Sequence, residues 1–170
     1  PELWDHCRRW GVDPLLVLAV MRQESVYNPN AISPTGAMGL VQFIKGTGAK
    51  VSAMLEEPLY SPYDLFDPSI NLRYAVFYLK ILSERFGSNF PVAVASYNGG
   101  PHYMSRDHRD LLGEVPLDAF VEMIERKEPR DYVKKVTGYY QRYVELYAPP
   151  GSRVVLPAKV TADNPKIVDF

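Results

Sequence analysis

The chain has 170 residues, of which 46 % are hydrophobic and 23 % charged, a composition typical of one globular domain with its own hydrophobic core. Its formal net charge is −1, so no overall field indicates nucleic acid or an anionic membrane as a partner. The lone Cys7 excludes an intramolecular disulfide, and no apolar run approaches the ~18 residues of a membrane-spanning helix.

The first predicted helix covers residues 14–27 and carries Glu24 in its last turn. Asp13 is a favourable N-cap residue, and proline is favoured at the first helical position, where Pro14 stands. Pro29 disfavours continuation, because the residue before a proline avoids helical backbone angles. The sequence therefore predicts that the helix ends shortly after Glu24.

Residues 28–39 are predicted to form a shaped loop, since they hold two prolines and two glycines. Ser33, Thr35, Gly36 and Gly39 are small, and we expect free backbone N–H donors here, directly after Glu24. Such donors suit a close-fitting ligand site.

Three more helices are predicted, over residues 68–86, 91–98 and 128–147. The first begins at Asp67-Pro68 and ends before Gly87, and the second ends at Gly99-Gly100. The third repeats aromatic and apolar residues at helical spacing. No strand pair, hairpin or internal repeat is present, so the sequence predicts an all-α fold.

Glu24 would lie on an apolar helix face together with Val17, Val20 and Met21. Partial desolvation and the negative end of the helix dipole both disfavour a carboxylate there, so we expect a raised pKa. Residues 25–55 contain no other acid. A carboxyl group kept protonated near neutral pH can protonate a leaving glycosidic oxygen.

The alternative is that Glu24 is an ordinary helix-end acid paired with Arg22, which by residue type alone is the commoner situation. The glycine-containing loop that follows favours the functional interpretation.

Three short stretches of the chain are distinctive when taken together. They are Glu24-Ser25, Asn28-Pro29, Ser33-Pro34, Gly36-Ala37 and Gly39-Leu40 with Gln42; then Ser96-Tyr97-Asn98-Gly99-Gly100-Pro101; then Glu128-Pro129-Arg130-Asp131-Tyr132-Val133. In this order they resemble the catalytic domain of the soluble lytic transglycosylases, which cleave bacterial peptidoglycan. Each fragment alone is weak, but the ordered set is highly specific.

The resemblance covers roughly residues 13–147 and implies a goose-type lysozyme-like helical fold with a substrate groove. It implies a catalytic domain over residues 1–148, followed by an extended proline-rich tail over 149–170 whose role it does not indicate. The tail holds four prolines in 22 residues, so we expect it either to lie on the domain or to lead to something absent. Because Pro1 is not a natural start, we expect a piece of a longer protein with additional domains.

Three positions depart from the family pattern. Val41 stands where methionine is common, Ser96 where alanine is usual, and Pro129 where threonine is usual. The first two are changes of packing size, and the first turn of a helix tolerates proline. None of the three removes a residue with a chemical role.

The resemblance implies that Glu24 is the single catalytic acid/base. It would protonate the oxygen between N-acetylmuramic acid and N-acetylglucosamine, and the muramoyl 6-hydroxyl would then attack its own ring carbon. Such a reaction leaves 1,6-anhydro-N-acetylmuramic acid ends without hydrolysis. An intramolecular attack needs no second carboxylate to activate water.

The resemblance also implies the binding residues. Ser33 and Gln42 would hydrogen-bond the N-acetyl and hydroxyl groups of the sugars, and Tyr97 and Asn98 would position the muramoyl residue opposite Glu24. Glu128 would line the groove, with helix capping beside Arg130 as the equally weighted alternative. Tyr132 is left as either groove or core.

No metal or cofactor is predicted. His102, Asp107, His108 and Asp110 cluster in the sequence without a ligand spacing, and we expect them to be charged residues of a solvated loop.

Two other functions stay open. A hydrolytic goose-type lysozyme would need a placed second acid to activate water, and an inactive glycan-binding module would need no acid at all. The expected partners are peptidoglycan glycan strands, not nucleic acid. The resemblance implies the bacterial cell envelope, either periplasmic or associated with the outer membrane.

Overall fold

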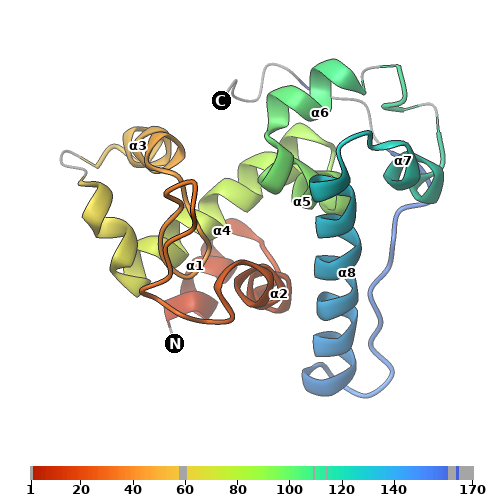
Figure 1. Cartoon of the computed structure of the whole chain (residues 1–170). Coiled ribbons are helices and arrows are strands. Elements are labelled where there is room, and N and C mark those ends of the chain that lie inside the picture. Colours follow the sequence, from red (N-terminus) through yellow and green to blue (C-terminus); the bar gives the residue numbers. More distant parts are fainter. Residues whose placement is uncertain (1, 58–60, 109, 114, 161–163, 165–170) are drawn as a thin grey trace. The chain divides into compact units, whose positions relative to one another are not determined.

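The computed structural model describes residues 2–57, 61–108, 110–113, 115–160 and 164. Within them the chain forms eight α-helices, one short 3-10 helix and only isolated β-bridges (Figure 1). The all-α prediction is confirmed. By its contacts the chain divides into two compact units, residues 1–78 and 79–170.

The first unit contains α1 (Glu2–Trp10), α2 (Pro14–Ser25), α3 (Lys45–Met54), η1 (Pro62–Phe66) and the first half of α4 (Pro68–Arg85). The predicted start of α2 is confirmed, because the Asp13 side chain accepts a hydrogen bond from the backbone N–H of Leu15 at 2.8 Å. Helix α3 was not predicted. Its segment holds two glycines, which are poor helix formers, so tertiary packing outweighs local preference there.

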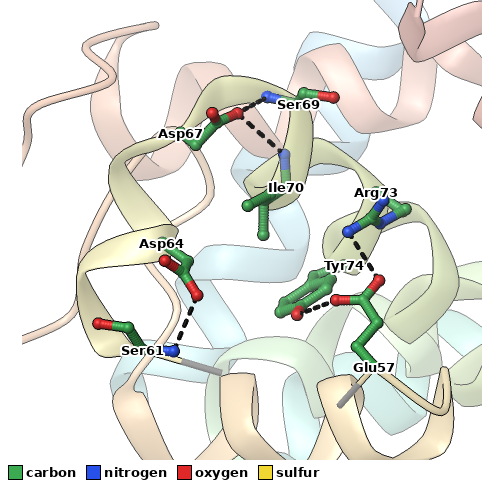
Figure 2. A network of polar contacts seen from close by, with 8 residues as sticks. All are labelled: Glu57, Ser61, Asp64, Asp67, Ser69, Ile70, Arg73 and Tyr74. Carbon is green, nitrogen blue, oxygen red and sulfur yellow. Dashed lines mark hydrogen bonds and ion pairs between the residues drawn. The ribbon is translucent and has the colours of Figure 1, made fainter. Parts of the chain in front are cut away.

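The N-terminal turns of α4 are held by side chains on several sides (Figure 2). Asp67 caps the helix by accepting hydrogen bonds from the N–H groups of Ser69 and Ile70. Tyr74 donates its hydroxyl to Glu57, and Arg73 pairs with the same carboxylate at 2.6 Å. Burial, reinforced by the Glu57 carboxylate, raises the pKa of Tyr74 to about 12, so its hydroxyl stays a donor at physiological pH.

The second unit contains the rest of α4, then α5 (Phe90–Gly99), α6 (Pro101–Asp107), α7 (Leu117–Met123) and α8 (Lys127–Tyr147). Helix α5 packs against both α6 and α8, and α7 packs against α8. The predicted helices 68–86, 91–98 and 128–147 are each confirmed to within one residue at either end.

Residues 149–160 form no helix, and their last part is attached to the second unit. Leu117 donates its N–H to the carbonyl of Ala158 at 3.2 Å, and Val160 donates to Val115 at 3.3 Å. Val160 is buried. Residues 161–163 and 165–170 of the predicted tail lie outside the described part of the chain, and the predicted domain boundary after residue 148 stays a prediction.

In the described part of the chain, no helix combines the length and the apolar character needed to cross a membrane.

Candidate active site

Glu24 lies in the last turn of α2 and is half-buried. The three residues predicted to share its face, Val17, Val20 and Met21, are all buried. The apolar setting predicted for this carboxyl group is therefore present in the first unit.

Helix α2 ends at Ser25, two residues earlier than predicted, because the backbone turns left-handed. Val26 has φ 50° and ψ 41°, and Tyr27 has φ 64°. A β-branched residue rarely adopts this region, since its side chain crowds the backbone. Such strained positions occur where neighbouring structure imposes them, often beside functional sites. The chain therefore turns sharply within two residues of Glu24.

Ser25 connects the end of α2 to the loop that follows. Its hydroxyl donates to the backbone carbonyl of Leu40 at 2.7 Å. The residue next to Glu24 thus fixes a point of the loop fifteen residues further along the chain. Ser25 belongs to the family motif, but the motif alone did not indicate this structural role.

The predicted loop is confirmed as a non-helical, internally bonded structure. Met38 forms β-bridges with both Ile32 and Phe43, and the N–H groups of Met38 and Phe43 donate to each other's carbonyls at 2.9 and 3.1 Å. The segment from residue 31 to residue 43 is therefore folded on itself.

The prediction of free backbone donors in this loop is wrong for three of the four small residues. The N–H groups of Ser33 and Gly36 donate to Ala37 and Ser33, both at 2.9 Å, and that of Gly39 donates to Ala31 at 3.0 Å. Closing the loop on itself therefore uses the backbone donors of Ser33, Gly36 and Gly39.

The Ser33 hydroxyl is partly used by the loop. It accepts a hydrogen bond from the Ala37 N–H at 2.9 Å and lies 2.9 Å from the Thr35 hydroxyl. The two hydroxyl groups carry two hydrogens and need one for their mutual bond. One hydroxyl hydrogen of the Ser33–Thr35 pair therefore remains for a ligand.

Gln42 is held in a fixed orientation. Its Nε2 donates to the carbonyls of Ala31 at 3.1 Å and Gly39 at 2.8 Å, so both amide hydrogens are used. The carbonyl oxygen Oε1 is the remaining polar atom of the side chain. Gln42 can therefore act on a ligand only as a hydrogen-bond acceptor.

Gly39 occupies a position that admits no side chain. Its φ is +81°, and a Cβ atom would lie 2.1 Å from the carbonyl oxygen of Leu65 and 2.5 Å from Nδ2 of Asn71. The glycine in the motif is thus explained by close approach as well as by backbone angle.

The second unit brings together the other predicted residues. Tyr97 and Asn98 lie at the end of α5, and Glu128 lies in the first turn of α8. Nδ2 of Asn98 donates to Oε1 of Glu128 at 3.2 Å. Tyr132, left open between groove and core, is only 4 % exposed and belongs to the core.

Close packing of α5 on α8 sets up this pair. A Cβ atom on Gly99 would lie 3.1 Å from Cβ of Pro129, tighter than an ordinary contact. The glycine after Asn98 therefore lies against the proline after Glu128. Pro129, one of the three departures from the family pattern, has a packing role here.

The expected solvated loop around His102 is wrong in part. His102 and Asp107 lie on α6, and His108 follows it buried between Tyr103 and Phe120. Among the described residues, no group of three or more His, Cys, Asp or Glu side chains is arranged to hold a metal ion.

Comparison with known proteins matches residues 5–110 to the transglycosylase SLT domain. The soluble lytic murein transglycosylase of Escherichia coli strain K12 is 40 % identical over 129 residues, covering 74 % of this chain and 20 % of that protein. The chain thus spans about a fifth of that relative.

Two solved structures are similar in fold. An inactive mutant of the lytic transglycosylase Slt from Pseudomonas aeruginosa has a TM-score of 0.81 and 30 % identity over 95 % of this chain and 26 % of its own. The complex of the 70-kDa soluble lytic transglycosylase with bulgecin A has a TM-score of 0.82 and 31 % identity over 91 % of this chain and 26 % of its own. The chain belongs to the transglycosylase SLT family.

Proposed function

We propose that this chain cleaves the bond between N-acetylmuramic acid and N-acetylglucosamine in peptidoglycan, and that it does so without water. The observation that carries the proposal is the half-buried Glu24 at the abrupt end of α2, attached through Ser25 to an ordered loop. Membership of the transglycosylase SLT family supports the same chemistry.

In the proposed reaction Glu24 starts protonated and gives its proton to the glycosidic oxygen as the bond to the muramoyl anomeric carbon breaks. The substrate's own N-acetyl group stabilises the positive charge that develops on that carbon. The Glu24 carboxylate then takes the proton of the muramoyl 6-hydroxyl, whose oxygen bonds to the anomeric carbon. The acid is regenerated and the product carries a 1,6-anhydro ring.

The binding roles follow from the atoms that remain available. Gln42 would accept a hydrogen bond from an amide N–H or hydroxyl of the sugar through Oε1, because its amide hydrogens are used in the loop. The Ser33–Thr35 pair would donate its remaining hydroxyl hydrogen. Tyr97 and Asn98 would position the muramoyl residue, and Glu128 would line the groove, with helix capping as its alternative role.

Digestion of purified peptidoglycan sacculi in water enriched in heavy oxygen tests this function. We expect muropeptides that end in 1,6-anhydro-N-acetylmuramic acid, carry no heavy oxygen and resist borohydride reduction. Heavy oxygen at the muramoyl anomeric carbon would instead identify a hydrolytic lysozyme. Binding of sacculi without any released product would identify an inactive glycan-binding module.

The same proposal places the protein in the bacterial cell envelope, because its substrate is the cell-wall polymer. Glycan strands of peptidoglycan are the proposed partner. We propose residues 1–148 as the catalytic domain and residues 149–170 as a separate tail, to which no role is assigned.

A further inference from the structure

A buried amide side chain from α4 is built into the loop that carries Gln42. Asn71 has no exposed surface and makes three hydrogen bonds. Its Nδ2 donates to the carbonyls of Leu65 at 2.9 Å and Met38 at 3.3 Å, and its Oδ1 accepts from the N–H of Val41 at 3.0 Å.

Two of these contacts, those with Met38 and Val41, hold the turn over residues 39–42. Met38 precedes the turn and Val41 lies within it, next to Gln42. One rigid side chain therefore fixes a backbone carbonyl and a backbone N–H three residues apart. A displacement of the turn that separates these atoms would leave buried polar groups without partners, which is costly.

Gly39 and Asn71 fit one another. The absence of a side chain on Gly39 leaves the space that the Asn71 amide and the Leu65 carbonyl occupy. The left-handed backbone of Gly39 also turns the chain toward Val41. The complementarity is steric as well as polar, so it specifies one position of the turn.

Asn71 is itself held firmly. The Asp67 cap lies four residues before it on α4, and the contacts of Arg73 and Tyr74 with Glu57 follow it directly (Figure 2). A side chain on a helix that is anchored on both sides of it can hold a loop in a well-defined position.

We propose that Asn71 is a positioning residue for the proposed reaction. It sets the register of the turn over residues 39–42, and thereby aims the acceptor oxygen of Gln42 at the substrate. Ser25 fixes Leu40 of the same turn to the end of α2, beside Glu24. The turn is thus held from the acid side by Ser25 and from the α4 side by Asn71. The catalytic part of this inference rests on the proposed function, whereas the structural part does not.

The first experiment follows hydrogen exchange in the Asn71→Ser variant. Loss of the Oδ1 acceptor is expected to speed exchange of the Val41 amide on the order of 10-fold or more, while the Leu55 amide at the end of α3 changes far less. The matched control is Asn89→Ser. Asn89 is equally buried, accepts from Val92 and donates to Lys159 in the second unit. Equal exchange changes at Val41 in both variants would overturn the inference.

The second experiment measures kcat on sacculi in a double-mutant cycle with Gln42→Ala. Asn71→Ser alone is expected to lower kcat on the order of 10- to 100-fold, because small misplacements of binding groups are costly. In the Gln42→Ala background the further loss is expected to be less than about 3-fold, since the oriented group is gone. If Asn71→Ser lowered kcat equally in the wild-type and Gln42→Ala backgrounds, Asn71 would stabilise the fold without orienting Gln42.

The kcat of each variant is measured at the same number of degrees below its own Tm. The Asn89→Ser control is expected to keep kcat within about 2-fold of the wild-type value, because the hydrogen bonds of Asn89 lie outside the loop. If Asn71→Ser does not fold, Asn71→Asp replaces it in the kcat cycle, because it removes the donors to Met38 and Leu65. Its Oδ1 still accepts from Val41, so in this variant the Val41 amide is expected to exchange at nearly the wild-type rate. If the wild-type protein releases no anhydro product, the proposed function fails, and the exchange of Val41 alone decides the structural inference.

Discussion

The candidate residues of the first unit and those of the second are held in different ways. In the loop after Glu24 the polar groups bond one another. The Ser33–Thr35 pair keeps one hydroxyl hydrogen for a ligand, and Gln42 keeps its Oε1 oxygen. In the second unit, helix packing of Gly99 on Pro129 positions the ends of α5 and α8. A hydrogen bond between the half-buried Asn98 and the exposed Glu128 connects two of the candidate residues there.

The difference indicates that the two sets of residues contribute differently to substrate binding. A loop that bonds itself is preorganised, so it loses little conformational freedom when a substrate binds. A carboxylate on an exposed helix end can adjust its position, but the bond it makes is weak in water. We therefore expect substitutions in the first unit to affect turnover strongly and those at Glu128 to affect it mildly.

The sharpest test exchanges the two carboxyl groups for amides. Glu24→Gln is expected to lower turnover on the order of 10³-fold or more, because the amide cannot transfer the proton, while Tm changes little. Glu128→Gln is expected to cost less than about 10-fold, since the amide can still accept from Asn98. Release of muropeptides from sacculi measures both. If Glu24→Gln lowered turnover only mildly and Glu128→Gln lowered it severely, the expectation that the first unit dominates turnover would be wrong.

The preorganisation of the loop can be broken at Gly39. Gly39→Ala is expected to lower the free energy of unfolding by about 3 kcal/mol, because its Cβ would collide with Leu65 and Asn71 on a left-handed backbone. Gly36→Ala is the matched control, with the same φ of +81° and nothing within 4 Å, and is expected to cost about 1 kcal/mol. Denaturant titration gives both values, and equal costs would show that the loop yields to the added methyl group.

The second unit should be sensitive to acid through His108. Burial lowers the pKa of His108, with the Tyr103 backbone and Asp107 opposing the effect. As the pH falls below about 6.5, the unfolded chain takes up the proton first, so stability is complete above that pH and declines below it.

Below pH 6.5 the decline attributable to His108 is expected to reach at most about 1.4 kcal/mol per pH unit. His108→Phe keeps an aromatic ring against Tyr103 and Phe120 and should flatten this slope. His6, whose pKa burial also lowers, contributes equally to both proteins. An unchanged slope in denaturant titrations at several pH values would contradict the assignment to His108.

The smallest expected effect concerns packing beside Tyr97. Ser96 is fully buried, and its hydroxyl has no hydrogen-bond partner among the described residues. Ser96→Ala is expected to raise the free energy of unfolding by about 1 kcal/mol, because it removes a desolvated polar group. The buried Ser52, whose hydroxyl bonds Tyr74, is the control, and Ser52→Ala should destabilise by a similar amount. A loss of stability in Ser96→Ala would mean that the hydroxyl has a partner in solution.

Local sequence signals predicted the helices that carry the site. Asp13, Asp67 and the glycines after α4 and α5 mark helix ends through capping and backbone angle, which depend on near neighbours. The early end of α2 was missed because valine and tyrosine give no local sign of a left-handed turn. Helix α3 was missed because its glycines favour a loop unless tertiary contacts intervene.

The family pattern identified the candidate residues, but it gave no account of how the loop holds itself. Which backbone donors remain available depends on contacts between residues that close the loop, and spacing does not encode them. Asn71 did carry a signal, because it lies on the helix face that also carries the buried Ala75, Tyr78 and Leu82. A polar side chain on such a face must find partners.

The bond between Asn71 and Val41 also constrains the order of folding. The two residues lie thirty positions apart in the chain, so the turn that carries Gln42 cannot take its final form until α4 has docked on it. Any intermediate without α4 would contain every residue of the loop and yet no formed site. Val41 is therefore a reporter of the docking of α4 on the loop, and a chain cut before residue 71 should bind no glycan through this loop.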